Sequence, residues 1–164
     1  MNITNEITTL STEILDLCRV KGLRITTAES CTGGLVIAAL TDIVGSSDVI
    51  DRGFITYSNE SKCEMLGVRV ELLSLHGAVS APVASAMAEG AMNSSDAELT
   101  VSITGIAGPG GGTADKPVGT VYIATTLEND RTLYQKYFFE GGRESIRQQT
   151  VLAALTSLKA RITT

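Results

Sequence analysis

A short segment of this chain holds the residue types that a covalent hydrolase needs. Ser46 and Ser47 lie side by side, Tyr57 follows ten residues after the second serine, and Lys62 follows five residues after the tyrosine. A serine hydroxyl is a poor nucleophile until a neighbouring base takes its proton, and a neutral lysine amine can be that base in place of histidine. The segment therefore favours covalent hydrolysis. Blander interpretations stay open: two turn serines, a packing tyrosine and a solvated helical lysine.

Lys62 can act as a base only if its pKa lies far below the ordinary value. A lysine with a pKa near 10.4 is neutral in about one molecule in 2,500 at pH 7, so a working base needs a pKa roughly three lower. The positive end of the helix that Lys62 is expected to begin acts in this direction, and burial must supply the rest. Glu60 and Glu64 would oppose the lowering if they faced the amine.

Strands and helices alternate through the first two thirds of the sequence, and these elements must position the reactive residues. The predicted strands cover residues 24–28, 53–57, 99–104, 118–127 and 132–139. The predicted helices are one stopped by Gly22, one over 35–43, one from Ser58 or Asn59 to Leu66, one ending at Gly77, one over 83–92 and one over 143–162. Tyr57 then ends a strand, and Lys62 lies near the start of the next helix.

The order of these elements predicts the fold class. Alternating strands and helices indicate a sheet covered on both faces, and the turn at 128–130 predicts an antiparallel hairpin at the end of the sheet. We expect an α/β protein, a three-layer α/β/α sandwich with a mixed, mainly parallel sheet. Residues 1–164 hold no evident repeat or linker, so we expect a single domain.

Two further motifs directly follow predicted strands, where ligands bind in such sheets. Residues 26–34 (TTAESCTGG) combine hydroxyls and glycines before a helix whose backbone N–H groups can hold an anion; the alternative is a capped turn. Residues 104–112 (TGIAGPGGG) could wrap a phosphate or a ribose, although a flexible loop is an equal alternative. The second motif is neither a Walker A loop nor GxGxxG.

Composition excludes several classes of function. A net charge of −5 with 13 basic and 18 acidic residues argues against a nucleic-acid partner. No apolar stretch is long enough for a membrane span, and the first ten residues do not resemble a signal peptide, so we expect a cytoplasmic protein. Three scattered cysteines suit a reducing compartment, and among them Cys31 could have a pKa lowered by a helix N-terminus. One histidine and no CxxC pair predict no metal site.

Taken together, the motifs resemble the CinA C-terminal domain family. The matching strings are TAESCTGG at 27–34, GSS at 45–47, TYSN at 56–59 with Lys62, SITGIAGP at 102–109 and KPVGTV at 116–121. The resemblance covers nearly the whole chain and implies a mixed-sheet α/β/α sandwich. Stand-alone members of the family are nicotinamide-nucleotide amidases, so the resemblance implies an amidase.

The resemblance also implies roles for particular residues. Ser47 matches the proposed nucleophile, with Tyr57 and Lys62 as its partners, the lysine taking the proton directly or through the tyrosine. The implied reaction hydrolyses the carboxamide of nicotinamide mononucleotide to nicotinic acid mononucleotide and ammonia, a step of pyridine nucleotide salvage, without metal or cofactor. The implied substrate-binding residues are Ser30, Thr32, Gly33, Gly34, Thr104, Gly105 and Arg143. Gly142 stands where the family often has Asp, which affects the role of Arg143.

Two other functions stay open at this stage. One is a non-catalytic module that binds a nucleotide, and the other is an amidase for another small carboxamide. In each case the expected partner is a small-molecule nucleotide or carboxamide, and we expect the chain to form a homo-oligomer. Ammonia release, with and without the serine hydroxyl, distinguishes the three functions.

Overall fold

The sheet has five strands in the order β2-β1-β3-β4-β5. The computed structural model describes residues 2–164. The strands are β1 (Ile25–Glu29), β2 (Ile50–Ile55), β3 (Leu99–Gly105), β4 (Thr120–Leu127) and β5 (Leu133–Phe138). β1 pairs in parallel with β2 and β3, whereas β4 pairs antiparallel with β3 and β5. The predicted mixed sheet with a terminal hairpin is confirmed.

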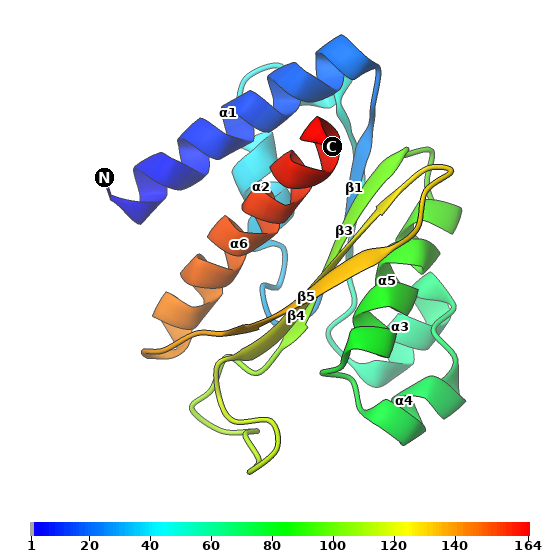
Figure 1. Cartoon of the computed structure of the whole chain (residues 1–164), viewed down its shortest axis with the longest axis vertical. Helices are drawn as coiled ribbons and strands as arrows, with labels where there is room; N and C mark the ends of the chain where they lie inside the picture. The colour runs from blue at the N-terminus through cyan, green and yellow to red at the C-terminus, as the bar shows by residue number, and fades with distance from the viewer. Residues whose placement is uncertain (1) are drawn as a thin grey trace.

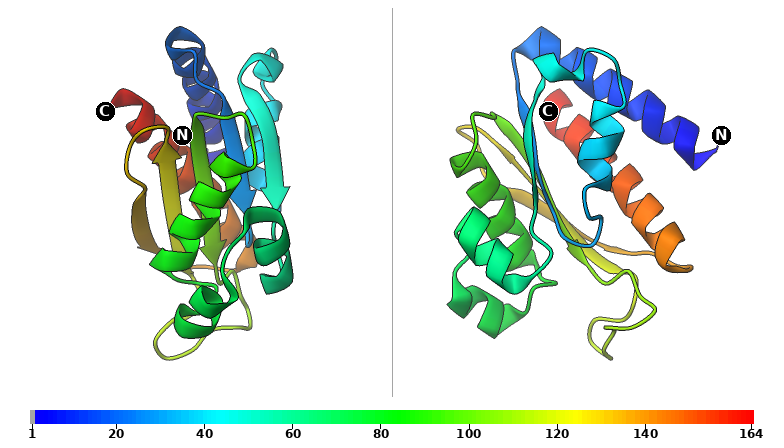
Figure 2. Two further views of the ribbon diagram at one scale, coloured as in Figure 1. Left: turned by 90° about the vertical axis from the view of Figure 1, so that its right-hand side faces the viewer. Right: turned by 180° about the vertical axis from the view of Figure 1, so that it is seen from behind.

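Helices cover both faces of this sheet. They are α1 (Ile3–Lys21), α2 (Leu35–Thr41), α3 (Asn59–Leu66), α4 (Val70–His76), α5 (Ala81–Asn93) and α6 (Arg143–Thr163), with a short 3-10 helix, η1 (Ser46–Asp48). Figure 1 shows α1, α2 and α6 on one face and α3, α4 and α5 on the other, and the two views of Figure 2 agree. The three-layer α/β/α sandwich is therefore confirmed.

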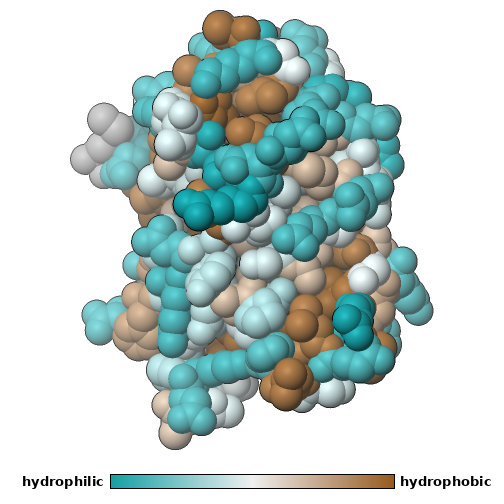
Figure 3. Space-filling model, turned by 45° about the vertical axis from the view of Figure 1, so that its right-hand side comes forward, coloured by the Kyte–Doolittle hydropathy of each residue, from teal (hydrophilic) through white to brown (hydrophobic). Residues whose placement is uncertain are grey.

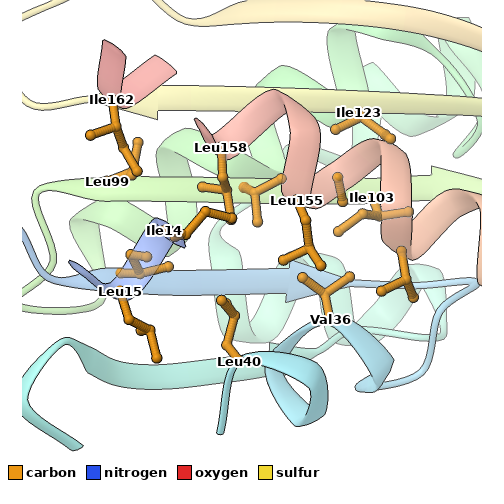
Figure 4. Packing of buried hydrophobic residues seen from close by; sticks show 14 of the residues in the cluster. Ile14, Leu15, Val36, Leu40, Leu99, Ile103, Ile123, Leu155, Leu158 and Ile162 are labelled. Atoms are coloured by element: carbon orange, nitrogen blue, oxygen red, sulfur yellow. The ribbon is translucent and has the colours of Figure 1, made fainter. Parts of the chain in front are cut away.

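Apolar side chains fill both interfaces between the sheet and the helices. The larger cluster joins β1, β3 and β4 to α1, α2 and α6, and Figure 4 shows Leu155 and Leu158 of α6 together with Ile103 and Leu99 of β3 in this cluster. The smaller cluster lies under α3, α4 and α5 and includes Leu66, Val83 and Met87. Because both faces are covered, every residue of β1 is buried.

Several helices begin at serine caps or end at glycines, as their sequences predict. Ser58 caps α3 by accepting the N–H of Ser61 at 3.0 Å, and Ser80 caps α5 in the same way. Gly22 and Gly67 end α1 and α3 in the left-handed conformation, with φ of 66° and 67°, which costs glycine little. The cap at Ser58 places Lys62 in the first turn of α3, as predicted.

The strand predicted over 53–57 differs most from the observed one. β2 begins at Ile50 and ends at Ile55, so Tyr57 lies two residues beyond the strand. Asp51 and Arg52 hide the start of β2 in the sequence because they are charged, yet the Arg24 guanidinium lies 2.8 Å from the Asp51 carboxylate. Neutralised charges can therefore continue a strand that hydropathy alone would end.

The parallel strands define two functionally different ends of the sheet. We call the end at which β1, β2 and β3 terminate the carboxyl edge, and the opposite end, where η1 leads into β2, the amino edge. On the face drawn in Figure 3, hydrophilic side chains cover much of the surface, and hydrophobic side chains gather near its top and in its lower part. Across residues 2–164, no helix has the length and apolar character that crossing a membrane requires.

Candidate active site

A pocket of about 210 Å³ lies at the carboxyl edge of the sheet. It brings together residues from the ends of β1 and β3, the start of α3, the α4–α5 loop and the start of α6. Its lining residues are Ser30, Cys31, Tyr57, Asn59, Lys62, Ala78, Val79, Thr104, Gly105, Ala107 and Arg143. Six of the residues named from the sequence, Ser30, Tyr57, Lys62, Thr104, Gly105 and Arg143, therefore share one pocket. Ligands bind at this edge in open α/β sheets.

Lys62 is the largest fully buried side chain described, with 1% of its surface exposed. Its Nζ atom lies 3.1 Å from the Ser30 Oγ atom, 2.8 Å from the Thr56 carbonyl oxygen and 3.3 Å from the Tyr57 carbonyl oxygen. All three contacts are to uncharged groups. Glu60 and Glu64 on the same helix are exposed, and neither carboxylate is among the groups that act on the Lys62 amine.

Burial lowers the pKa of Lys62 below its usual value of 10.5. Removing the amine from water disfavours its charged form, and the nearby Cys31 and Cys63 thiols only partly oppose this effect. The direction is the one that a general base requires, and burial is the cause that the sequence analysis expected. The Lys62 amine therefore loses its proton at a lower pH than the amine of a solvent-exposed lysine does.

The hydrogen bonds around Lys62 fit a neutral amine that faces a serine hydroxyl. A neutral amine has two N–H groups and one lone pair. The carbonyl oxygens of Thr56 and Tyr57 can accept the two N–H groups, which leaves the lone pair for the hydroxyl proton of Ser30. Ser30 is 8% exposed and lies directly after β1. A serine hydroxyl and a lysine amine are thus in hydrogen-bond contact, the arrangement that a nucleophile and its base require.

The structure does not bring Ser47 to this pocket. Ser47 lies in η1, before β2 begins, whereas Lys62 lies in α3, after β2 ends. A strand advances about 3.3 Å per residue, so six residues of β2 separate the two ends by roughly 17 Å. Ser47 is exposed at the amino edge, next to the ion pair of Arg19 and Asp48. The expected contact between Ser47 and Lys62 is wrong within one chain.

The order of the elements in the sequence could have identified Ser30, already named as a substrate-binding residue, as the serine that contacts Lys62. Ser30 and Lys62 both follow parallel strands, so they reach the same edge of the sheet. Ser47 precedes the strand that Tyr57 and Lys62 follow, so a single chain places it at the opposite edge. Spacing along the chain suggested proximity, but a strand that lies between two residues holds them apart.

The turn after Ser30 does not offer its helix N-terminus to a substrate anion. The buried carboxylate of Glu29 accepts the backbone N–H groups of Gly34, Val36 and Ile37 at 3.0, 3.1 and 2.9 Å. An acidic side chain of the protein itself therefore occupies the positive end of α2. The phosphate site expected at Thr32, Gly33 and Gly34 is wrong, and these residues do not line the pocket.

The other side of the same turn is held by Arg147 of α6. Its Nε atom donates to the Cys31 carbonyl oxygen and its second terminal nitrogen donates to the Thr32 carbonyl oxygen, both at 3.1 Å. Neither Glu29 nor Arg147 lines the pocket. Their link to the site was not visible in the sequence, because it depends on how α6 packs against the β1–α2 turn.

Tyr57 and Arg143 lie at the mouth of the pocket. The ring of Tyr57 is 64% exposed, and its hydroxyl lies 3.5 Å from the Arg143 guanidinium. Arg143 also donates to the Gly108 carbonyl oxygen at 2.9 Å, which links the first turn of α6 to the glycine-rich loop. The Tyr57 backbone carbonyl, not its hydroxyl, contacts Lys62. A proton relay through the Tyr57 hydroxyl therefore has no geometric support.

Thr104, Gly105 and Asn59 complete the polar wall. The Thr104 hydroxyl donates its proton to the Ala78 carbonyl oxygen at 2.9 Å, so toward a ligand the Thr104 oxygen can act only as an acceptor. A side chain at Gly105 would come within 2.7 Å of Val121, which explains why glycine stands there. Asn59 was not named from the sequence as a site residue, although it lies at the start of α3 and within the string TYSN that supports the family resemblance.

The remaining thiols and acids do not form a metal or thiolate site. Burial raises the pKa of the Cys31 thiol to about 12, with a further contribution from Glu29, so the expected lowering by a helix N-terminus is wrong. Within residues 2–164, no group of three His, Cys, Asp or Glu side chains could hold a metal ion. A larger cavity of about 300 Å³ lies between β5 and the end of α6, but no lysine lines it.

Comparisons with known proteins agree on one family. The model of the CinA C-terminal domain matches residues 7–162. Nicotinamide-nucleotide amidohydrolase PncC of Escherichia coli strain K12 is 47% identical over 154 residues, covering 94% of this chain and 93% of that protein. A CinA-like protein of Syntrophobacter fumaroxidans is 56% identical over 140 residues, covering 85% of this chain. This chain spans only 33% of that second relative.

Solved structures confirm the fold. The competence/damage inducible protein CihA from Agrobacterium tumefaciens has a TM-score of 0.94 at 48% identity, covering 97% of this chain and 96% of that chain. The competence damage-inducible protein A from Klebsiella pneumoniae has a TM-score of 0.92 at 34% identity, covering 96% and 97%. The α/β/α sandwich is therefore shared over nearly the whole length.

Proposed function

This chain belongs to the CinA C-terminal domain family, and from that premise we propose that it hydrolyses the carboxamide of nicotinamide mononucleotide to nicotinic acid mononucleotide and ammonia. The contact between Lys62 and Ser30 at 3.1 Å carries the chemical part of the proposal. The substrate part rests on the relative named nicotinamide-nucleotide amidohydrolase, which aligns with 94% of this chain.

Ser30 is the nucleophile of the proposed reaction and Lys62 is its base. Neutral Lys62 takes the Ser30 proton while Ser30 Oγ bonds to the carboxamide carbon. Lys62 then gives this proton to the departing nitrogen, and ammonia leaves. Lys62 next takes a proton from water, whose oxygen attacks the ester, and returns the proton to Ser30 as the acid is released. The Lys62 amine thus accepts and donates the proton in every step, so the proposed reaction requires no metal.

The exposed part of the pocket suits the remainder of the nucleotide. Arg143 supplies a guanidinium at the pocket mouth, where it can form charge-assisted hydrogen bonds with the 5′-phosphate. Tyr57 lies beside it and offers an aromatic face to the pyridine or ribose. Thr104 and Gly105, at the end of β3, line the inner wall beside Lys62. The side chain of Thr32 and the residues Gly33 and Gly34 do not line the pocket and bind no part of the nucleotide in this arrangement.

Ammonia release from nicotinamide mononucleotide tests the proposal. The wild-type protein is expected to release one ammonia per substrate, and Ser30→Ala is expected to lose this activity while binding the nucleotide by calorimetry. Binding without ammonia release in the wild type would support a non-catalytic nucleotide-binding module. Release from another small carboxamide, but not from the mononucleotide, would support an amidase of different specificity.

Two further parts of the proposal concern the metabolic role of the reaction and the oligomeric state of the protein. It would serve pyridine nucleotide salvage in the cytoplasm, where mononucleotides arise. We also propose that the chain forms a homo-oligomer, because eleven large hydrophobic side chains are exposed among residues 2–164, including Tyr134 and Phe138 of the edge strand β5. Analytical ultracentrifugation over a range of concentrations tests this assembly, and a monomer throughout would contradict it.

A further inference from the structure

The backbone after Ser30 is held from both sides by charged side chains that do not line the pocket. Glu29 holds three N–H groups at the start of α2, and Arg147 holds the carbonyl oxygens of Cys31 and Thr32. The proposed chemistry of Ser30 uses none of these five hydrogen bonds directly. The buried carboxylate of Glu29 and the half-buried guanidinium of Arg147 therefore both bind the backbone of one turn, residues 30–34.

The carbonyl contacts determine where the opposite N–H groups point. In a planar trans peptide, the C=O bond and the next N–H bond point in opposite directions. Because Arg147 holds the Cys31 carbonyl, the N–H of Thr32 points away from α6. The Ser30 carbonyl accepts the N–H of Gly33 at 3.1 Å, so the N–H of Cys31 points away from that bond.

These two N–H groups are the ones left without an acceptor in the turn. Within residues 2–164, no oxygen accepts the backbone N–H of Cys31 or Thr32, and the Cys31 N–H has only its own thiol beside it, whereas the N–H of Ser30 donates to the Ile103 carbonyl oxygen at 3.0 Å. Cys31 itself lines the pocket next to Ser30. A negative oxygen that forms on a carbon bonded to Ser30 requires hydrogen-bond donors at this place.

We infer that Arg147 is a positioning residue that holds the N–H groups of Cys31 and Thr32 as an oxyanion hole for the Ser30 reaction. This inference rests on the proposed function of Ser30 as a nucleophile. Gly33 makes the contact feasible, because its φ is 59° and a side chain there would lie 3.3 Å from the Arg147 guanidinium. Glu29 anchors the other end of the turn by its bonds to α2.

Arginine suits this position better than lysine. Its guanidinium donates to two successive carbonyl oxygens at once, through Nε and one terminal nitrogen. A lysine amine at the same place could hold one of these carbonyls with less directional constraint. Arg147→Lys should therefore retain part of the function, and Arg147→Gln should lose more of it.

A boronic acid tests the oxyanion hole without relying on the natural substrate. In 3-pyridylboronic acid, the Ser30 oxygen bonds to boron, its proton passes to Lys62, and the boron becomes a tetrahedral anion. Boron NMR identifies the tetrahedral adduct, and calorimetry measures the affinities of the boronic acid and of nicotinic acid, a planar ligand with the same ring. The ratio of the two affinities should fall about tenfold or more in Arg147→Gln, and less in Arg147→Lys.

Arg69→Gln is the matched control, since the Arg69 side chain is 80% exposed at the start of α4. It should leave the ratio unchanged, and thermal melting should show that all variants fold. An unchanged ratio in folded Arg147→Gln, or no tetrahedral adduct in the wild type, would overturn the inference. An adduct in a wild type that releases no ammonia from nicotinamide mononucleotide would instead overturn the proposed substrate.

Steady-state kinetics give a second test with a different readout. Arg147→Gln should lower kcat about 10- to 100-fold with KM within about threefold, because the hole acts only as charge develops. A variant that raises KM and leaves kcat unchanged would show that Arg147 contributes to substrate binding alone, which would contradict a positioning role in the reaction.

Discussion

The two ends of the parallel strands carry serines in opposite surroundings. At the carboxyl edge, Ser30 is 8% exposed and in hydrogen-bond contact with the buried Lys62. At the amino edge, Ser47 is exposed and lies beside ion-paired surface residues. The hydroxyl groups are chemically identical, so any difference in reactivity comes from the neighbours that the fold supplies.

Charged groups at the two ends show the same contrast. Lys62 is buried among uncharged partners, and burial lowers its pKa by disfavouring the ammonium form. At the amino edge, burial would raise the pKa of Asp51, but the hydrogen bond from Arg52, the backbone N–H of Asp96 and the charge of Arg24 together lower it. The first lowering favours a neutral, reactive group and the second a charged, structural one. Under the proposed function, the carboxyl edge therefore supplies reactivity and the amino edge supplies stability.

The comparison is tested most strongly by removing each serine hydroxyl. Ser30→Ala should lower kcat/KM for ammonia release about 10⁴-fold or more, since the nucleophile is lost. Ser47→Ala should keep activity within about twofold, because surface substitutions away from the site usually have small effects. A coupled ammonia assay measures both. The reverse result would place the nucleophile at the amino edge, supplied to the pocket by another chain.

Replacing Lys62 should have the next largest effect. Lys62→Arg should lower kcat about 10³-fold, because general-base catalysis contributes about 10²- to 10⁴-fold and a guanidinium does not deprotonate. Single-turnover kinetics measure the chemical step. Full activity in this variant would eliminate lysine as the base, while an unchanged melting temperature would exclude a folding defect.

Loss of the Arg143 guanidinium should weaken substrate binding more than chemistry. Arg143→Ala should raise KM about 10- to 100-fold, since a charge-assisted hydrogen bond contributes about 1.5–3 kcal/mol, with a smaller change in kcat. Nicotinamide riboside, which lacks the phosphate, is the control substrate and should respond little to the substitution. Equal losses for both substrates would contradict a phosphate contact.

The pH dependence should report the protonation of Lys62. Activity requires the neutral amine, so kcat/KM should fall about tenfold per pH unit on the acidic side of the Lys62 pKa. Because burial lowers this pKa, the limb should lie below the usual lysine value of 10.5. Activity that rises with pH only around the value of a free lysine would contradict a buried base.

The smallest effect is expected from replacing Asp51 at the amino edge, which should change the stability of the protein and not its activity. Asp51→Asn should lower the free energy of unfolding by about 1 kcal/mol at pH 7, with activity unchanged. Since folding lowers the Asp51 pKa, its stabilisation is complete above the unfolded value near 3.8 and is lost as pH falls through the folded value. Urea denaturation of both proteins should therefore converge at acidic pH. A constant difference at every pH would contradict the assignment.

The fold could be predicted because its determinants are local in the sequence. Helix caps such as Ser58 and Gly67 end α3 where expected, and the alternation of strands and helices predicts a sheet covered on both faces. The start of β2 could not be predicted, because Asp51 and Arg52 depend on partners that only the fold supplies. Strand order likewise depends on packing between distant segments.

The site could be predicted only in part. Tyr57 and Lys62 converge because both follow β2 at the carboxyl edge. Arg143 joins them because α6 begins beside that edge. The predicted contact between Ser47 and Lys62 is wrong because β2 lies between the two residues, so their closeness along the chain does not bring them together in space. Glu29 and Arg147 could not be found, since nothing in their local sequence indicates that they hold the same turn.

The identity of the acylated serine tests the central claim most directly. Wild-type protein is mixed with nicotinamide mononucleotide, quenched in acid within milliseconds, digested and analysed by mass spectrometry. We predict that the nicotinic acid mononucleotide acyl group is found on Ser30, and that Arg147→Gln forms this adduct more slowly. The acyl group on Ser47, or no acyl-enzyme while ammonia is released, would contradict the assignment of the carboxyl edge as the catalytic site.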